Sequence, residues 1–411
     1  MKRRPSIARW RWLSMLVALG AAAGASAQFG NSVSTWSHSF GDADYTSVAR
    51  VVAAHDGTFA VAGEAGLSDA LRLMGETGHV LMVRKMDAGG GVRWGHTFAP
   101  FGMKANYAAK GLAEDRGGNL IVAGSVEASD DEQAPRDVVL MKVSPAGKQL
   151  WARRYGAPGD NDEAEQVLVT PAGDYLVLAR SGQSPASTWL FEVGSDGTFK
   201  GESRFPGELY GGISPTAGGY LLTGPDLMKV DTAGKTVWHR KLGMGLGAAM
   251  ARTDETHLLV TTLKQQGGGY FPGIAMTSLD GKVAWTRLYR FAGMRLAQFT
   301  TVVRTPRGFL LGGLEEADLG APNEGFVIMT DSSGTPVWKR DVAESGRGSM
   351  IEDLAATPDH GYLAVGNIDA GVHIMDNGHG LAVGKGLVIK TDDAGNSPGL
   401  MPVDPRAVRT G

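Results

Sequence analysis

Three features of the 411-residue sequence predict an all-β fold built from repeated four-stranded units. Glycine contributes 60 residues, about twice its average share of roughly 7%, which indicates a chain dense in turns. Short apolar runs such as VLMVRKM and GYLAVG, bounded by glycine, asparagine or aspartate, have the composition of β-strands. No stretch after residue 27 keeps the apolar spacing of an amphipathic helix for three turns.

A repeated tryptophan defines the units. It stands at the same place in six copies of one phrase, and a turn glycine lies four residues before each copy after the first. Two further turns, at Gly197 and Gly395, have the same spacing but carry Gly201 and Gly399 in place of tryptophan. Successive positions are 37 to 61 residues apart, which gives seven units. The six tryptophans are Trp36, Trp94, Trp151, Trp238, Trp285 and Trp338.

Each unit contains four expected strands. In residues 151–201 they are expected at 151–156, 165–170, 174–179 and 188–193, separated by loops and by the tight turns PAG and SDG. A unit of about 50 residues is too small to bury both faces of its sheet alone, so units must stack on their neighbours. The sequence therefore predicts a seven-bladed β-propeller with four-stranded antiparallel blades; a linear solenoid is the alternative.

The two ends of the repeat predict how the ring closes. The first unit begins with the tryptophan strand at Trp36, whereas the last ends after Gly399, where Pro402 and Pro405 oppose a further strand. We therefore expect the N-terminal strand to complete the last blade. The expected organisation is a single propeller over residues 28–400, followed by a C-terminal tail over residues 401–411.

Residues 1–27 have the features of a secretory signal peptide. A basic start precedes the apolar stretch WLSMLVALGAAAG and the small residues Ala25, Ser26 and Ala27. The apolar run of about a dozen residues is shorter than the roughly 20 needed to span a membrane. Cleavage is expected near Ala27, and the protein is expected in the periplasm or secreted, with no membrane span.

Charge and cysteine content exclude several kinds of partner and chemistry. Loss of the five basic residues of the leader leaves 35 basic against 43 acidic side chains, a formal charge of −8. Nucleic acid and anionic membranes are therefore not expected partners. The absence of cysteine excludes disulfides, thiolate metal sites and cysteine nucleophiles. We expect a monomer that engages a protein or glycan in the bacterial envelope or outside the cell.

Two phrases resemble a known repeat. KVDTAGKTVW at residues 229–238 and LMKVSPAGKQLW at residues 140–151 resemble the tryptophan-docking repeats of quinoprotein-like propellers, in which tryptophan wedges between blades. Over residues 36–399 the chain looks closer still to repeat propellers of bacterial secreted proteins. It departs from the quinoproteins because Asp231 lies three residues before Gly234 instead of four. The vicinal cysteine pair of that family is absent, and its metal-binding carboxylate and asparagine residues have no recognisable counterpart here. No cofactor is predicted.

The antiparallel order of strands sorts each blade into two faces. Both loops fall on one face and both tight turns on the other. The first, the long-loop face, carries the expected insertions and is the expected location of any site. The insertions are 64–79, 127–137, 264–272, 315–325 and 367–385.

Aromatic and acidic residues of the long-loop face are candidates for binding sugars or a peptide. The alternative is that the aromatic side chains pack at loop bases and the carboxylates only solubilise loop tips. Calcium is a candidate ligand of the acidic loops, although no dedicated calcium-loop motif is present. The candidate binding residues are Tyr45, Tyr107, Asp160, Asp162, Tyr210, Tyr270 and Phe271.

One short cluster has the chemistry of a metal site. His373, Asp376 and His379 combine imidazole and carboxylate ligands within a glycine-rich segment. The alternative is a solvated loop.

These observations favour binding over catalysis. We expect an exported, non-catalytic binding or scaffolding propeller that engages its ligand or partner through the long-loop face. A glycan-acting hydrolase or lyase, with carboxylates and tyrosines at the channel mouth, is the alternative, and a quinoprotein-like oxidoreductase is a third interpretation. No catalytic residue can be assigned from the sequence.

Overall fold

The computed structural model divides the chain into two compact units, Met1–Ser32 and Val33–Gly411. The residues that it describes all belong to the second unit, so the predicted signal peptide lies outside them. Between residues 369 and 383 the side chains are not described. The described residues are 33–41, 46–66, 78–103, 105–127, 135–182, 186–241, 249–318, 321–343, 348–374 and 380–411.

The described chain is all-β, as predicted, and its regular elements are strands and one short 3₁₀-helix. Four consecutive sheets are four-stranded and antiparallel. The first is β2 (Thr46–Ala53), β3 (Phe59–Gly66), β4 (His79–Met86) and β5 (Val92–Phe98). The second is β6 (Asn106–Glu114), β7 (Leu120–Glu127), β8 (Arg136–Val143) and β9 (Gln149–Tyr155). The third is β10 (Glu163–Val169), β11 (Tyr175–Ser181), β12 (Ser187–Val193) and β13 (Phe199–Pro206). The fourth is β14 (Gly212–Thr216), β15 (Gly219–Thr223), β16 (Leu227–Asp231) and β17 (Thr236–Arg240).

The next two runs of four antiparallel strands belong to one larger sheet. They are joined where β20 and β22 pair in parallel through Tyr270 and Leu296. The first run is β18 (Met250–Arg252), β19 (His257–Gln266), β20 (Gly269–Ser278) and β21 (Val283–Phe291). The second is β22 (Leu296–Thr305), β23 (Gly308–Glu316), β24 (Glu324–Thr330) and β25 (Pro336–Val342).

The last four-stranded sheet contains both early and late residues of the chain. Its order is β1-β28-β27-β26, and Trp36 of β1 lies opposite Lys390 of β28. The N-terminal strand therefore takes the outer position of this sheet. Its strands are β1 (Trp36–Phe40), β26 (Ser349–Ala356), β27 (Tyr362–Ile374) and β28 (Gly380–Thr391).

The C-terminal residues differ from the expectation. Pro402 and Pro405 were expected to oppose a strand, but Leu400–Val403 forms β29, which pairs with β25, and Val408–Thr410 forms β30, which pairs with β21. An edge strand tolerates proline because one of its sides has no partner for the N–H group. Pro405 begins the 3₁₀-helix η1 (Pro405–Ala407), where proline is also accepted.

Two expected loop insertions are largely strand. β19 and β20 continue across residues 264–272 to a hairpin between Gln266 and Gly269, and β27 and β28 continue into the 367–385 insertion. Tyr270 and Phe271 therefore lie in β20 and not in a loop.

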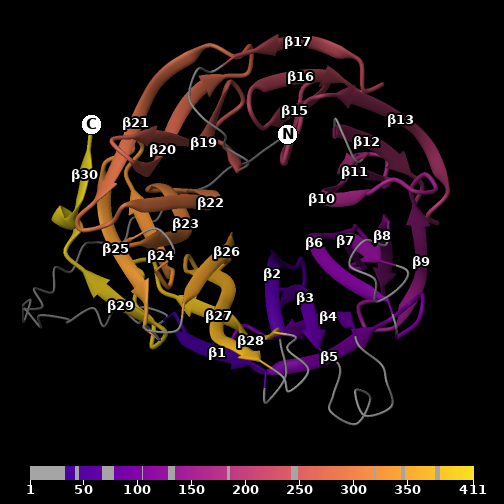
Figure 1. Cartoon of the computed structure of the whole chain (residues 1–411), viewed down its shortest axis with the longest axis horizontal. Helices are drawn as coiled ribbons and strands as arrows, with labels where there is room; N and C mark the ends of the chain where they lie inside the picture. Colours follow the sequence, from indigo (N-terminus) through magenta and orange to yellow (C-terminus); the bar gives the residue numbers. More distant parts are fainter. Residues whose placement is uncertain are drawn as a thin grey trace, which may run out of the picture. The chain divides into compact units, whose positions relative to one another are not determined.

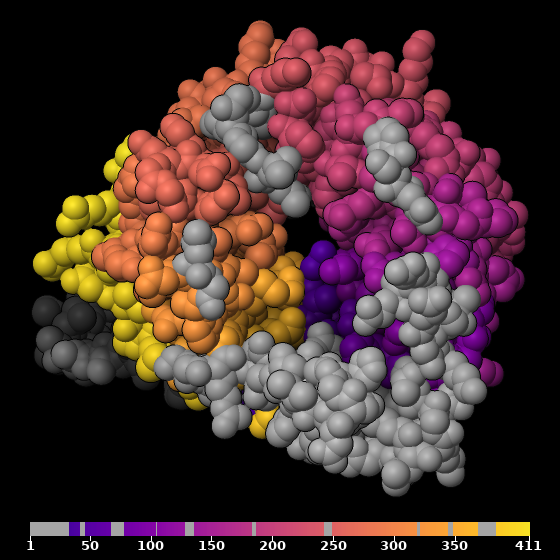
Figure 2. Space-filling view, viewed as in Figure 1, coloured from indigo at the N-terminus to yellow at the C-terminus, as the bar shows by residue number. Residues whose placement is uncertain are grey.

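Within Val33–Gly411 the sheets follow one another around a common centre (Figure 1). Their inner strands are β2, β6, β10, β14, β18, β22 and β26. The second and third strands of the sheets are the most buried, and every residue of β7 is buried. The arrangement is propeller-like. On the face shown in Figure 2 the centre is hollowed between the indigo segment of β2 and β3 and the orange-to-gold segment of β26. Among the described residues, no helix is long and apolar enough to cross a membrane.

Tryptophan side chains connect neighbouring sheets. Trp94 of β5 packs on the turn glycine Gly147 between β8 and β9, and its indole N–H donates to the Pro145 carbonyl at 2.9 Å. Trp36, Trp151, Trp238 and Trp338 lie in the same way on Gly90, Gly197, Gly281 and Gly395, where an added Cβ would lie 2.7–3.3 Å from the tryptophan ring. Each of these turns needs glycine twice, for its positive φ and for the close ring.

Trp285 departs from this pattern. The turn glycine after it, Gly334, is covered by Ile274, Arg287 and Tyr289, and the Tyr289 hydroxyl donates to the Gly334 carbonyl at 2.6 Å. A tyrosine four residues further along the strand thus takes the place of the indole.

Candidate functional site

Five of the inner strands contain a β-bulge near their beginning. In β2, β6, β10, β22 and β26 the pairing register shifts by one residue. The extra residue is left without a partner across the sheet, and such bulges re-aim side chains. All five extra residues line one of two central cavities. They are Ala49, Lys110, Glu165, Thr300 and Glu352.

The larger central cavity, here called the channel cavity, has a volume of about 590 Å³. It is lined by Asn106 at the start of β6, Glu127 at the end of β7 and Arg136 at the start of β8. These strand ends carry the long loops, so the cavity lies on the long-loop face. Its glutamates are Glu64, Glu127, Glu163, Glu165 and Glu352, and its cationic side chains are Arg50, Lys110 and Arg136.

A smaller cavity of about 250 Å³ adjoins it. The two share Arg50, Glu165 and Glu352 as lining residues, and the smaller one adds Asp353 and Thr300. The centre of the molecule is therefore polar and carries more carboxylates than cations.

Glu64 bridges two neighbouring sheets. From β3, its Oε1 accepts a hydrogen bond from the Ala109 N–H of β6 at 3.1 Å. Burial, with a smaller contribution from the Glu352 carboxylate, raises the pKa of Glu64 to about 7, although the Ala109 N–H and Lys110 act in the opposite direction. Near neutral pH this carboxyl group is partly protonated.

Three more carboxyl groups at the centre are destabilised in their charged form. Burial raises the pKa of Glu165, Glu352 and Asp353, against the opposing influence of Arg180 on Glu165 and of Arg50 on Glu352 and Asp353. Asp353 is the most enclosed, and its Oδ2 accepts from the Val51 N–H of the next sheet at 3.0 Å. A cation entering the centre would favour ionisation of these groups.

Arg136 organises the outer part of the channel cavity. Its guanidinium group donates to Glu127 and to Glu163, which come from different sheets. These contacts raise the pKa of Arg136 further, with the hydrogen bond to Glu163 as the main cause. Its charge is thus already balanced within the protein.

Tyr107 is the predicted binding residue that lines the channel cavity. Its ring is buried, its hydroxyl donates to the Gly102 carbonyl at 3.2 Å and accepts from the Phe101 N–H at 2.8 Å. The side chain is thus packed at a loop base, which was the alternative interpretation of these tyrosines.

Tyr210, Tyr270 and Phe271 lie away from the two central cavities as described. Tyr210 is buried and donates to Glu208 at 2.9 Å, and burial raises its pKa. Tyr270 and Phe271 are half-buried in β20, where Arg290 stacks on the Phe271 ring with 4.3 Å to its centroid.

The two predicted aspartates belong to the loop before β10. Asp162 is fully buried and its Oδ2 accepts from the Ala157 N–H at 3.1 Å, while its own N–H donates to the Arg136 carbonyl at 2.7 Å. Asp160 is half-buried, and its N–H also bonds within the loop, to the Ala157 carbonyl at 3.1 Å. In this arrangement Asp162 shapes the loop that positions Arg136.

Four predicted site residues fall outside what can be described. Tyr45, Asp376 and His379 are not among the described residues, and for His373 the structure describes the backbone position in β27 but not the side chain. The predicted metal ligands His373, Asp376 and His379 therefore lie outside the described side chains.

A separate acidic cluster lies at the long-loop ends of β23, β24 and β25. Oxygens of Glu315, Glu324 and Asp341 lie within 4.8 Å of one another. The buried Lys339 ammonium donates to Glu315 at 2.8 Å and also to Asp341, and burial raises the pKa of Glu315 to about 7. The cluster thus carries its own cation.

The central charges were missed by the sequence interpretation because they lie inside strands. In AAKGLAE, EAEQVLV and MIEDLAA a charged residue interrupts the alternation of an inner strand at Lys110, Glu165 and Glu352. Such a break in period is the signal of a bulge, and would have placed these side chains at the centre.

Comparison with known proteins gives structural similarities at low identity. The chain matches a crystal structure of RRP9 WD40 repeats with 9% identity over 86% of this chain and 97% of that one (TM-score 0.49). It matches a protein of unknown function from Dyadobacter fermentans with 12% identity over 87% and 98% (TM-score 0.49). A Synechocystis apocarotenoid oxygenase matches with 10% identity over 89% and 96% (TM-score 0.45).

No protein-family model matches the chain, and no curated protein matches it. The resemblance to quinoprotein-like and secreted repeat propellers therefore rests on the sequence phrases alone.

Proposed function

We propose that the protein is an exported seven-bladed β-propeller that binds a hydrophilic, cationic ligand in the channel cavity. The count of seven is supported by the larger sheet, which contains two antiparallel runs of four strands joined through a single parallel pair. Export is supported by the composition of residues 1–27.

The observation that carries the binding proposal is the set of central carboxyl groups with raised pKa values. Glu64, Glu165 and Glu352 line one cavity of about 590 Å³, and burial disfavours the charged form of each. Glu165 already pairs with Arg180 at 2.7 Å, and a ligand with an ammonium or guanidinium group would add a further counter-charge and hydrogen-bond donors for the three carboxyl groups. An amine-bearing glycan or a basic peptide segment has this chemistry.

Calorimetric titration with a tetramer of glucosamine, compared with a tetramer of N-acetylglucosamine, tests the proposal. We expect the amine form to bind at least about tenfold more tightly, because acetylation removes its charge. The double variant Glu165→Gln, Glu352→Gln should lose this preference, and Glu202→Gln, an exposed change on β13, should keep it. Equal binding of the two sugars would contradict the proposal. It would also be contradicted if neither sugar binds and a lysine-rich peptide does not bind either.

The second candidate is a glycan hydrolase or lyase that uses the same cavity. It is favoured by Glu64, whose pKa of about 7 suits a general acid near neutral pH. It is also favoured by a carboxylate and an arginine that meet in the channel cavity, where Arg136 pairs with Glu127. Against it, Glu64 is committed to a backbone hydrogen bond.

Product analysis after incubation with neutral and amine-bearing oligosaccharides separates the two functions. An enzyme should release shorter sugars and lose about 10²–10⁴-fold in rate on Glu64→Gln, while Glu202→Gln remains active. A protein that binds but never shortens the sugars is a binding module.

A further inference from the structure

One of the connections between sheets lacks its tryptophan. On β13 the register position is held by Gly201, which lies opposite Glu192 just as Trp151 lies opposite Lys142 in the preceding sheet. The side chain two residues later, which also contacts the turn glycine elsewhere, is the small Ser203. The two side chains that fill the equivalent space between other sheets are therefore replaced here by glycine at position 201 and serine at position 203.

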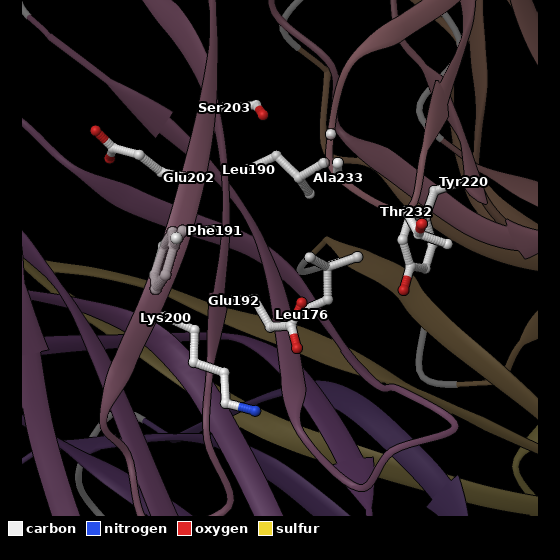
Figure 3. Close-up of a pocket in the computed structure, with 12 residues that line it drawn as sticks. Leu176, Leu190, Phe191, Glu192, Lys200, Glu202, Ser203, Tyr220, Thr232 and Ala233 are labelled. Atoms are coloured by element: carbon white, nitrogen blue, oxygen red, sulfur yellow. The ribbon is translucent and has the colours of Figure 1, made fainter. Parts of the chain in front are cut away.

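The missing side chain leaves a cavity of about 260 Å³ between the β10–β13 and β14–β17 sheets, here called the empty slot. A Cβ added at Gly201 would meet nothing within 4 Å. Figure 3 shows Leu176, Leu190 and Glu192 of the first sheet facing Tyr220 and Thr232 of the second. The empty slot thus has the walls of the tryptophan-filled sites between other sheets, but no tryptophan side chain occupies it.

Exposure of the turn glycines supports this comparison. Gly90, Gly147, Gly197, Gly281, Gly334 and Gly395 are all buried by the side chains that cover them, whereas Gly234 in the empty slot is half-exposed. Thr232 and Ala233 beside it are exposed, so the slot is reached from solvent.

The polar groups of the empty slot also match those of the turns that a tryptophan covers. In three of those, the indole N–H donates to the carbonyl two residues before the turn glycine, as from Trp151 to Ser195 at 3.2 Å. The equivalent acceptor here is the Thr232 carbonyl, to which no hydrogen bond is made within the described residues. Glu192 stands where lysine pairs with tryptophan in neighbouring sheets, and burial raises its pKa.

We propose that the empty slot binds an indole ring supplied from outside the chain, as free indole or as the tryptophan side chain of a peptide. The ring would stack against the Gly234 turn between Leu190 and Tyr220 and donate its N–H to the Thr232 carbonyl. The volume suffices, because a cavity of about 150 Å³ already holds benzene. This site is on the outer part of the molecule and is independent of the channel cavity.

Fluorine NMR with 5-fluoroindole tests the proposal without interference from the protein's own tryptophans. The full chain should broaden and shift the ligand resonance in a saturable way. Gly201→Trp, which fills the slot, should abolish the effect, and Gly201→Ala, which leaves most of the slot open, should retain it. An unchanged response in Gly201→Trp, or no response in the wild type, overturns the proposal.

Two further arms give the source of the ring and the role of the hydrogen bond. 1-Methyl-5-fluoroindole, which lacks the N–H donor, should bind about 2- to 12-fold more weakly. Competition by N-acetyltryptophanamide and by a tryptophan-containing hexapeptide distinguishes a peptide ligand, which displaces the probe, from free indole alone, for which neither competes.

A stability measurement guards against misfolding of the filled variant. Gly201→Trp should raise the melting temperature, by about 2 °C or more, because it adds the packing that the other sheets have. A second variant, Trp151→Gly, creates a new slot on Gly197 and should add one further 5-fluoroindole site. If the new slot binds the probe and the natural one does not, the natural slot is not an indole site.

Discussion

The carboxyl group of Glu64 shows how one position serves different chemistries in different sheets. Asn367 occupies the equivalent place in β27, and its Oδ1 accepts from the Val48 N–H at 2.8 Å, as Glu64 accepts from Ala109 at 3.1 Å. An amide makes this bridge without charge. A glutamate makes it at the cost of burying a carboxylate, which is why its pKa rises.

The pKa of Glu64 predicts a dependence of stability on pH. Because the folded pKa of about 7 exceeds the value of 4.5 in the unfolded chain, the folded state retains the proton longer. Stability from this group is complete below about pH 4.5, falls as the pH rises to 7, and is then constant. The total change is about 3 kcal/mol.

Glu64→Gln should remove this dependence while keeping the bridge to Ala109. In urea unfolding, the variant should be more stable than the wild type at pH 8 by up to about 3 kcal/mol and nearly equal to it at pH 4.5. Glu315, whose pKa is also raised to about 7, is common to both proteins and cancels in the comparison. A variant that is less stable at pH 8 would show that the charge on Glu64 is favourable.

At the scale of strands and turns, the tryptophans hold neighbouring sheets together from their outer strands. Trp151 packs on Gly197 and donates to Ser195, whereas the turn glycine after Trp285, Gly334, lies closest to Ile274, Arg287 and Tyr289. Tryptophan at the same repeat position therefore covers the following turn glycine in one sheet and not in another.

Trp151→Ala should therefore destabilise the protein more than Trp285→Ala. Loss of the packed ring at position 151 should lower the free energy of unfolding by about 3–5 kcal/mol. At position 285 we expect about 1–2 kcal/mol, the cost of an ordinary substitution. Melting and urea unfolding of both variants check this, and equal losses would show that contact with the turn glycine is unimportant.

The sequence predicted elements well where local chemistry determines them. Turn glycines, strand composition and the tryptophan phase together indicated all-β units of four strands. Tail strands β29 and β30 were missed because proline argues against a strand only where both edges are paired. The central carboxylates were missed because a bulge, a tertiary feature, aims Glu165 and Glu352 inward.

For the whole molecule, β1 joins the beginning of the described chain to its last large sheet. Its residues supply the outer edge of that sheet, where Trp36 covers Gly90 of the next. Without β1, strand β28 would have an open edge and the contact to the β2–β5 sheet would be lost.

Deletion of residues 28–40 should consequently weaken the fold as a whole. We expect faster cleavage by a nonspecific protease across several sheets and a lower melting temperature, because the closing contact is shared by two sheets. A deletion variant as resistant to protease as the full chain would contradict closure by β1. Gly201→Ala, which leaves every strand in place, is a suitable control.

The pairing of β1 with β28 also determines the order in which the molecule can be completed. Trp36 and its partner Lys390 lie at nearly opposite ends of the described chain, so this contact has a very long sequence separation. Each four-stranded sheet between them can form from residues that are close in sequence. The pairing of β1 with β28, by contrast, cannot form before β28 is in place. Since loop closure over such lengths slows folding, joining the ends is expected to be a late event, with the first strand left unpaired until the last sheet arrives.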